Sequence, residues 1–109
     1  MVNHVEVFAA LGDANRTRMV TLLSRGDVSV SQLARHVDIS LPATLKHLGV
    51  LETAGLVSRT KTGRTVTVHL ETEPLSATEA WLHRTGSFWT SQLTALADSF
   101  VIPDTPPED

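Results

Sequence analysis

The side chains able to do chemistry in this chain are five histidines, twelve carboxylates and nine lysines and arginines. No cysteine is present, which excludes disulfides and thiolate metal sites and leaves histidine and carboxylate groups as candidate ligands. Glu79 and His83 stand four residues apart, so a helix would place them on one face. Two ligands are too few for a metal site, and a surface ion pair explains the spacing better. We therefore expect no metal and no cofactor, with Glu79 and His83 as the candidate pair to examine.

Catalysis is not indicated by the sequence. Serine, histidine and aspartate are scattered along the chain without a nucleophile elbow, a glycine-rich phosphate loop or paired carboxylates. We therefore expect a binding protein and not an enzyme.

Positive charge is concentrated in one segment of a chain that is acidic as a whole. The net charge is -3, which taken alone argues against a partner rich in phosphates. Residues 41–70 nevertheless carry a net charge of +3, whereas residues 1–40 are neutral and the remainder is acidic. The charged side chains of this segment are Lys46, Arg59, Lys61, Arg64 and Glu52. The local excess favours DNA as a partner; the alternative is that these charges only keep the segment soluble.

Residues 31–57 have the pattern of two helices joined by a tight corner and followed by a strand. Ser31 is expected to cap the first helix, and Ser40 with Pro42 to begin the second. Gly55 is expected to end the second helix, since glycine readily adopts the left-handed cap. This order is typical of a winged helix-turn-helix, whose second helix enters the major groove of DNA.

The periodicity of the second helix of this motif allows two interpretations of which face is buried. Leu41, Leu45 and Leu48 form one apolar stripe, and burying it would turn Ala43, Lys46, His47 and Val50 toward DNA. Thr44, Leu48 and Leu51 form a second stripe, and burying that one would expose Leu41, Pro42, Leu45, Lys46 and Gly49. Periodicity favours the first interpretation.

Residues 56–70 alternate as a β-hairpin with a turn at Thr62 and Gly63. This hairpin is the expected wing. Lys61 and Arg64 lie near its tip, where an arginine can enter a narrow minor groove or reach a phosphate. The alternative is that these charges protect an exposed strand edge from aggregation.

The helices expected at the two ends of the domain carry apolar stripes that suit a dimer interface. An N-terminal helix of about nine residues cannot persist alone, and the final helix, opened by Pro74, has apolar residues seven apart. We predict one domain over residues 1–101 and a disordered, acidic, proline-rich tail over residues 102–109. The expected interface residues are Val5, Phe8, Leu82, Phe88, Trp89, Leu93 and Leu96.

A second helix, which follows the N-terminal one, is expected to start at Asp13 or Asn15 and to turn Arg16 outward.

The sequence contains neither an apolar run long enough to span a membrane nor a secretion signal. We therefore expect a cytoplasmic protein without a membrane partner.

Two stretches resemble the ArsR-type (arsenic repressor) family of small dimeric repressors. Residues 11–16, Leu-Gly-Asp-Ala-Asn-Arg, are similar to the family opening Leu-x-Asp-Pro-Thr-Arg. Residues 40–57, Ser-Leu-Pro-Ala-Thr-Leu-Lys-His-Leu-Gly-Val-Leu-Glu-Thr-Ala-Gly-Leu-Val, are similar to Ser-Gln-Pro-Ala-Val-Ser-His-His-Leu-Lys-Val-Leu-x-x-Ala-Gly-Leu-Val. Ser29-Val30-Ser31 stands where arsenic-responsive relatives carry Cys-Val-Cys, so that metal site is absent.

The resemblance implies a mainly helical winged helix-turn-helix with a small β-hairpin, dimerised by its N- and C-terminal helices. It implies a repressor of a pseudo-palindromic operator in double-stranded DNA, with Thr44 buried. Alternatives are an interaction module without DNA binding and a repressor that responds to metal through histidine and carboxylates; the effector is unknown. The DNA-binding residues that we expect are Ser40, Leu41, Pro42, Ala43, Leu45, Lys46, His47, Gly49, Lys61 and Arg64.

Overall fold

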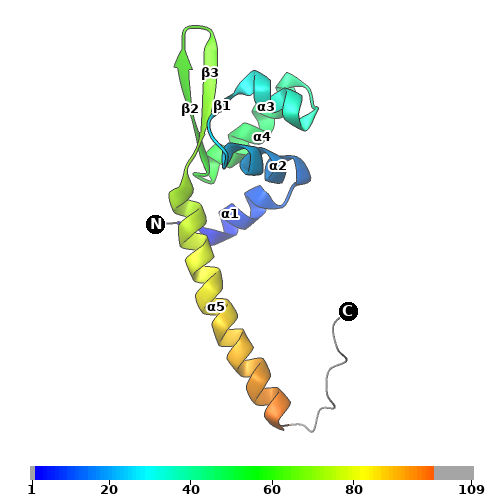
Figure 1. Ribbon diagram of the computed structural model, residues 1–109, viewed down its shortest axis with the longest axis vertical. Coiled ribbons are helices and arrows are strands. Elements are labelled where there is room, and N and C mark those ends of the chain that lie inside the picture. The colour runs from blue at the N-terminus through cyan, green and yellow to red at the C-terminus, as the bar shows by residue number, and fades with distance from the viewer. Residues whose placement is uncertain (1, 100–109) are drawn as a thin grey trace. The chain divides into compact units, whose positions relative to one another are not determined.

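A computed structural model describes the backbone of residues 2–99 and the side chains of residues 2–86, 91, 94 and 95. The order of helices and strands is that of a winged helix-turn-helix, with the β-hairpin projecting beside the helix pair (Figure 1). The chain divides into two units after Thr78, and the first contains the motif, the wing and the core. The predicted tail, residues 102–109, lies outside the described residues. The elements are α1 (His4–Leu11), α2 (Ala14–Leu23), β1 (Val28–Ser29), α3 (Val30–Val37), α4 (Leu41–Thr53), β2 (Val57–Thr62), β3 (Thr65–Leu70) and α5 (Thr72–Ser99).

Side-chain caps start the first two helices. The Asn3 side-chain oxygen accepts a hydrogen bond from the backbone N–H of Glu6 at 3.2 Å, which starts α1. The Asp13 carboxylate accepts from the backbone N–H groups of Asn15 at 2.9 Å and Arg16 at 3.1 Å, which starts α2. The cap of α2 is therefore Asp13 rather than Asn15.

The cap of α3 is Ser29, so the prediction of Ser31 was wrong. The Ser29 hydroxyl accepts from the backbone N–H of Gln32 at 3.1 Å, and the Gln32 side-chain oxygen accepts from the backbone N–H of Ser29 at 2.9 Å. A capping box requires a glutamine or glutamate three residues after the cap. Gln32 follows Ser29 at this distance, whereas Ala34 follows Ser31. Asp38 ends α3 in the left-handed conformation, with φ at 61°.

The helix α4 begins at the predicted signals, Ser40 and Pro42. Its last residue is Thr53, and Gly55 follows with φ at 76°, a conformation that favours glycine. The backbone N–H of Leu56 donates to the carbonyl of Leu51 at 2.9 Å, which closes the helix end and directs the chain into β2.

The three strands form an antiparallel sheet in the order β1-β3-β2. Thr62 pairs with Thr65, which leaves Gly63 and Arg64 as the two residues of the hairpin turn. The predicted turn at Thr62 and Gly63 was therefore wrong by one residue. Gly63 has φ at 61°, and glycine is favoured at this first turn position.

The core lies where α2, α3 and α4 meet the sheet. Met19 and Leu23 of α2 are buried. The hydroxyl of buried Thr78, in the first turns of α5, bonds to His4 Nδ1 at 3.0 Å. This bond joins α1 to the start of α5 within the first unit. The other completely or almost completely buried side chains include Val7, Leu33, Leu48, Leu51, Leu56 and Val68.

Candidate nucleic-acid interface

The outward face of α4 is largely apolar and carries one cation. The Leu41 side chain is 48% exposed and that of Leu45 is 41% exposed, with Pro42 and Lys46 exposed beside them. Thr44 is completely buried on the opposite side of the helix. The exposed face is the one that the family resemblance implies, and the interpretation that buries Leu41 and Leu45 was wrong.

A local hydrogen bond explains why Thr44 occupies the core. Its hydroxyl donates to the backbone carbonyl of Ser40 at 2.9 Å, so burial leaves no unpaired polar group. Leu48 and Leu51 follow at helical spacing and are also completely buried. Burying these three side chains turns Leu41 and Leu45 toward solvent.

Three other predicted contact residues occupy less exposed or structural positions. The Ser40 hydroxyl accepts from the backbone N–H of Ala43 at 3.2 Å, so this serine caps α4. Ala43 and Gly49 are half-buried. A methyl group built on Gly49 would meet no atom within 4 Å, so open space adjoins the helix at this position.

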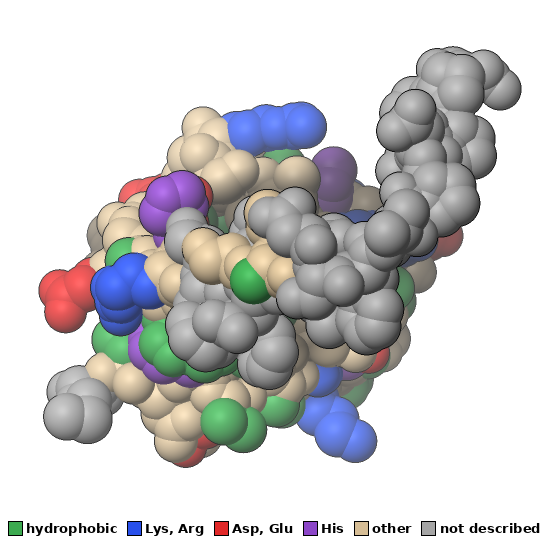
Figure 2. Space-filling view, turned by 90° about the horizontal axis from the view of Figure 1, so that it is seen from below, with side chains coloured by type: hydrophobic (Ala, Val, Ile, Leu, Met, Phe, Trp, Pro, Cys, Tyr) green, Lys and Arg blue, Asp and Glu red, His purple; other side chains and the backbone are tan. Residues whose placement is uncertain are grey.

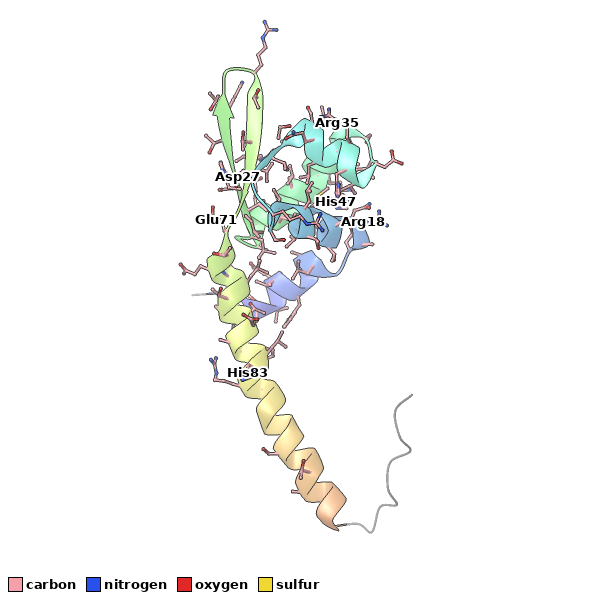
Figure 3. The ribbon with its side chains drawn as sticks, in the orientation of Figure 1. Arg18, Asp27, Arg35, His47, Glu71 and His83 are labelled. Carbon is pink, nitrogen blue, oxygen red and sulfur yellow. The ribbon has the colours of Figure 1, made fainter. Side chains whose placement is uncertain are left out.

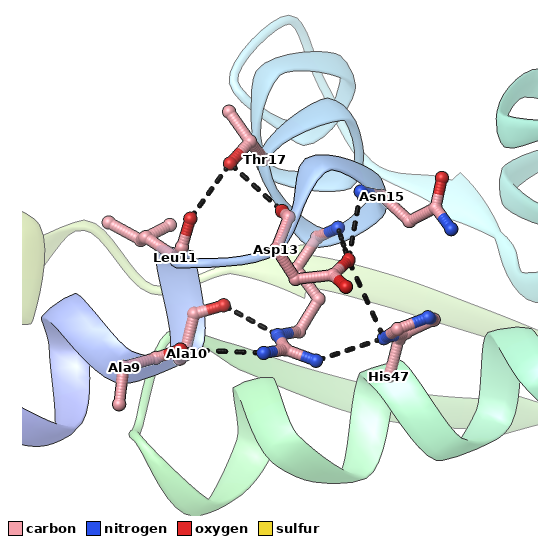
Figure 4. A network of polar contacts seen from close by, with 8 residues as sticks. Ala9, Ala10, Leu11, Asp13, Asn15, Thr17 and His47 are labelled. Atoms are coloured by element: carbon pink, nitrogen blue, oxygen red, sulfur yellow. Dashed lines mark hydrogen bonds and ion pairs between the residues drawn. The ribbon is translucent and has the colours of Figure 1, made fainter.

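The His47 side chain is half-buried and is held by Arg16 of α2 (Figure 4). Arginine has no acceptor, so the Arg16 guanidinium donates to His47 Nδ1, at 3.1 Å. Asp13 Oδ1 lies 3.9 Å from the same nitrogen, beyond hydrogen-bond distance. His47 is therefore tied to the neighbouring helix, and its contact with DNA stays a prediction.

Arg16 also binds the end of α1, so the prediction that it points outward was wrong. Its Nε donates to the carbonyl of Ala10 at 2.6 Å, and Nη2 lies 3.4 Å from the carbonyl of Ala9. Both carbonyls lie in the last turn of α1, where a nearby cation is favourable, and that of Ala9 also accepts from the backbone N–H of Gly12 at 3.2 Å. One guanidinium therefore joins α1, α2 and α4 and positions the helix that carries the outward face.

The Asp13 carboxyl beneath this network has a pKa below its ordinary value. The main cause is the backbone hydrogen bond from Arg16, which burial opposes, and the Asn15 amide adds to the lowering. The cap of α2 is thus kept in its charged, accepting form.

The wing carries two exposed cations near its tip. Lys61 is in β2 and Arg64 is in the turn, and both side chains are exposed. Arg59, in contrast, forms a double hydrogen bond with Glu52 of α4: Arg59 Nε donates to Glu52 Oε2 at 2.8 Å, and Nη2 donates to Oε1. Arg59 therefore holds the wing against α4, and its charge is balanced.

The ion pair shifts the pKa values of both partners. The hydrogen bonds from the Arg59 guanidinium lower the pKa of Glu52, and the same bonds raise the pKa of Arg59. Both groups remain charged near neutral pH, which keeps the wing attached to the recognition helix.

The base of the wing is held by a second polar group. The His69 ring bonds through Nδ1 to Asp27 Oδ2 at 2.6 Å and through Nε2 to the Thr60 hydroxyl at 2.9 Å. Asp27 lies beside the sheet, just before β1 (Figure 3). Thr60, His69 and Asp27 are linked in the order of a nucleophilic triad: hydroxyl, imidazole, carboxylate. None of the three lines either of the two clefts found among the described residues, next to α4 and the wing or next to α1 and α4. We interpret this group as the attachment of β1 to the hairpin.

The candidate metal pair is exposed. Glu79 and His83 both have exposed side chains in α5, and no group of three or more potential ligands is found among the described residues. The described residues therefore offer only this exposed pair as candidate metal ligands.

The face shown in Figure 2 has a mixed surface. Its described side chains of both charges are interspersed with hydrophobic ones.

Comparison with known proteins agrees with this geometry. The model of the bacterial regulatory proteins of the ArsR family matches residues 13–59, from the start of α2 to β2. The HTH-type transcriptional regulator Rv2034 of Mycobacterium tuberculosis is 39% identical over 88 residues, which cover 81% of this chain and 79% of that protein. This chain belongs to the ArsR family.

Two further relatives of this ArsR-family chain support the assignment. The transcriptional repressor SdpR of Bacillus subtilis is 32% identical over 76 residues, covering 70% of this chain and 84% of that protein. An ArsR-like transcriptional regulator from Rhodococcus sp. RHA1 superposes with a TM-score of 0.75 and 37% identity, covering 87% of this chain and 90% of that one.

Family membership confirms the main predictions from sequence. The ArsR-family chain is a DNA-binding transcriptional regulator with a winged helix-turn-helix and is not an enzyme. No helix in the described part of the chain is long and apolar enough to cross a membrane.

Sequence reasoning missed the residues that position the interface. Arg16 and the Glu52–Arg59 pair join separate elements, and contacts between elements follow no helical or strand periodicity that the sequence would show. The resemblance of residues 11–16 to a family motif was the only signal for Arg16, and it did not indicate the partner. Asp27 and His69 are 42 residues apart and gave no signal.

Proposed function

We propose that this ArsR-family regulator acts as a homodimeric repressor of a pseudo-palindromic operator. Each subunit places the outward face of α4 in a major groove, and the two grooves lie about 34 Å apart on one side of the duplex. The wings flank these grooves. The observation that carries the proposal is the exposure of Leu41 and Leu45 beside Lys46, with Thr44 buried behind them.

Exposed apolar side chains on the terminal helices support dimerisation. Val5 of α1 is 75% exposed and Phe8 is 39% exposed, and Leu82 of α5 is 48% exposed. Large apolar side chains exposed on a surface are typical of protein interfaces. Phe88, Trp89, Leu93 and Leu96 were predicted for the same interface, and their side chains lie outside the described residues, so they stay predictions.

The chemistry of the α4 face favours apolar recognition of bases. Leu41 and Leu45 have no hydrogen-bonding groups and suit contact with the methyl groups of thymine, which project into the major groove. Lys46 suits guanine O6 and N7 or a phosphate. We therefore expect an operator whose half-sites contain thymines at defined positions.

Two measurements test the proposal. Light scattering should give the mass of a dimer, and titrating DNA at several salt concentrations should show how the binding constant K depends on salt. Lys46, Lys61 and Arg64 in two subunits neutralise six phosphates, so log K should fall against log salt with a slope of about -5. Lys46→Ala combined with Arg64→Ala should reduce the slope to about -2. Arg18→Ala, an exposed arginine of α2 seen in Figure 3, is the matched control and should leave the slope unchanged.

A protein-interaction module is the second candidate, favoured by the acidic whole-chain charge and the apolar Leu41 and Leu45. This candidate predicts that the protein, whether monomer or dimer, captures a protein partner in a pull-down. It also predicts no gel shift with the DNA upstream of its own gene. A monomeric protein, or DNA affinity that is indifferent to salt, would contradict the repressor proposal.

A further inference from the structure

The cleft next to α1 and α4 has a volume of about 400 Å³, which is within the range of small-molecule sites. It lies within the first unit of the chain and contains neither Leu41 nor Leu45, so it is separate from the outward face of α4. Alanine side chains leave the space open, and a carboxylate and a guanidinium are at its walls. The lining includes Glu6, Ala9, Ala10, Arg16, Val50 and Ala54.

The Arg16 guanidinium retains donors that a ligand can use. Nε donates to the Ala10 carbonyl at 2.6 Å and Nη1 to His47 Nδ1 at 3.1 Å, whereas Nη2 reaches the Ala9 carbonyl only at 3.4 Å. A guanidinium has five N–H donors, so Nη1 and Nη2 each keep one N–H that no described residue accepts. Because Ala9 and Ala10 also line the cleft, the guanidinium that binds their carbonyls is at its wall. Arginine in this state is suited to a carboxylate.

Glu6 provides the opposite charge about one turn earlier in α1. Its side chain is exposed, and it precedes Ala10 by four residues, which places the two on one face about 6 Å apart along the helix axis. Ala9 and Val50 are exposed and provide apolar surface beside these charges. A short aliphatic chain with an amine at one end and a carboxylate at the other matches this arrangement.

The cleft uses a different face of α1 from the expected dimer interface. At about 100° per residue, the lining residues Glu6, Ala9 and Ala10 are centred roughly 120° around the helix from Val5 and Phe8. Dimerisation through Val5 and Phe8 therefore does not require the residues of the cleft.

We propose that this cleft binds a small aliphatic amino acid whose amine and carboxylate are at opposite ends. Arg16 binds the carboxylate, Glu6 binds the ammonium group, and Ala9 and Val50 contact the methylene groups. The carboxylate also takes Nη1 of Arg16 from His47, since a charged acceptor forms a stronger hydrogen bond than a neutral imidazole. Binding thereby loosens the attachment of α4 and lowers the affinity for DNA. This last step rests on the proposed function, whereas the binding site does not.

Isothermal titration calorimetry of the intact chain tests the site without DNA. The probe is 5-aminopentanoate, and its controls are pentanoate, which lacks the amine, and pentylamine, which lacks the carboxylate. The probe should bind with a Kd of about 1 mM or lower. Pentanoate should bind about three- to five-fold more weakly, because the contact with exposed Glu6 is lost. Pentylamine should bind at least about ten-fold more weakly, because it has no acceptor for Arg16.

Three variants locate the binding in the cleft. Glu6→Gln should weaken 5-aminopentanoate about three- to five-fold and leave pentanoate unchanged, because only the ammonium contact is removed. Ala9→Leu changes an exposed alanine, keeps its carbonyl, and should abolish binding by filling the cleft. Circular dichroism checks that this variant is folded. Arg18→Ala lies outside the cleft and should bind the probe as wild type does.

Competition with a duplex selected from a random library tests the regulatory step. Saturating 5-aminopentanoate should lower the affinity for the duplex about ten-fold, and the duplex should weaken binding of the probe by the same factor. The Ala9→Leu protein should bind the duplex equally well with and without the probe.

The outcomes separate the two proposals. If 5-aminopentanoate does not bind, or binds the folded Ala9→Leu protein or the Glu6→Gln protein as tightly as wild type, the site is refuted while the repressor proposal stands. If the probe binds in the cleft and the affinity for the duplex is unchanged, the regulatory step is refuted. If the protein binds no duplex even without the probe, the proposed function fails, and calorimetry still decides the site.

Discussion

Replacing Arg16 by alanine removes a side chain of α2 that bonds to both α1 and α4. The change takes away the donors to the carbonyl of Ala10, at 2.6 Å, and to His47 Nδ1, at 3.1 Å. It leaves the Asp13 cap intact, because that cap uses the backbone N–H of residue 16, which alanine also has. The perturbation is therefore confined to the connection between the helices.

The expected loss of stability follows from these two bonds. Hydrogen bonds from a charged donor contribute about 1.5–3 kcal/mol each, and the lower end applies because both bonds are only partly buried. The contact with the carbonyl of Ala9, at 3.4 Å, is too long to add much. Arg16→Ala should thus lower the free energy of unfolding by about 2–3 kcal/mol, a large part of the 5–15 kcal/mol typical of a domain.

Urea unfolding followed by circular dichroism, at one fixed protein concentration, measures this loss. Arg18→Ala changes an exposed arginine of the same helix and should stay within about 0.5 kcal/mol of wild type. Combining Arg16→Ala with His47→Ala should cost less than the sum of the single losses, because the two side chains share a bond. An Arg16→Ala protein as stable as Arg18→Ala would refute the positioning role.

Three other predictions concern α4 and its surroundings. Because Arg59 lowers the pKa of Glu52, the ion pair stabilises the fold above the ordinary glutamate pKa, and this stabilisation is lost as pH falls through the lowered pKa. Glu52→Gln should therefore lower the free energy of unfolding by about 0.2–1 kcal/mol near pH 7 and by little at acid pH, as measured by urea unfolding. Gly55→Ala should destabilise by about 1 kcal/mol because φ is positive there, whereas Gly49→Ala, within the helix and beside open space, should stabilise by a similar amount. Leu45→Ala should relax the preference for thymine in selected operators, and unchanged selection would contradict its contact with the base methyl.

Local signals account for the elements that could be predicted from the sequence. Ser40, Pro42 and Gly55 act on their own turn of the chain, so their types alone indicated where α4 starts and ends. The errors at Ser31 and at the hairpin turn were one or two residues long. The first arose because two serines, Ser29 and Ser31, were both able to cap α3, and the second because Gly63 can occupy either central position of a two-residue turn.

The orientation of α4 could not be predicted from periodicity, because the competing stripes differ by about 60°. Hydrophobicity favoured burying Leu41 over Thr44. The structure buries Thr44 because the Ser40 carbonyl accepts its hydroxyl, which removes the penalty for placing a polar group in the core. The bond from Thr44 to Ser40 is local, but it stabilises the fold only because the core covers Thr44.

The charge that faces DNA is also a property of the fold rather than of the sequence sum. The +3 of residues 41–70 counts Arg59 and Glu52 as independent, but they neutralise each other across seven residues while fastening the wing to α4. Lys46, Lys61 and Arg64 remain exposed, so the same total of +3 is now carried by three cations on the helix and wing. An acidic protein can therefore bind a polyanion provided that its ion pairs serve as structural contacts and its exposed cations surround the reading face.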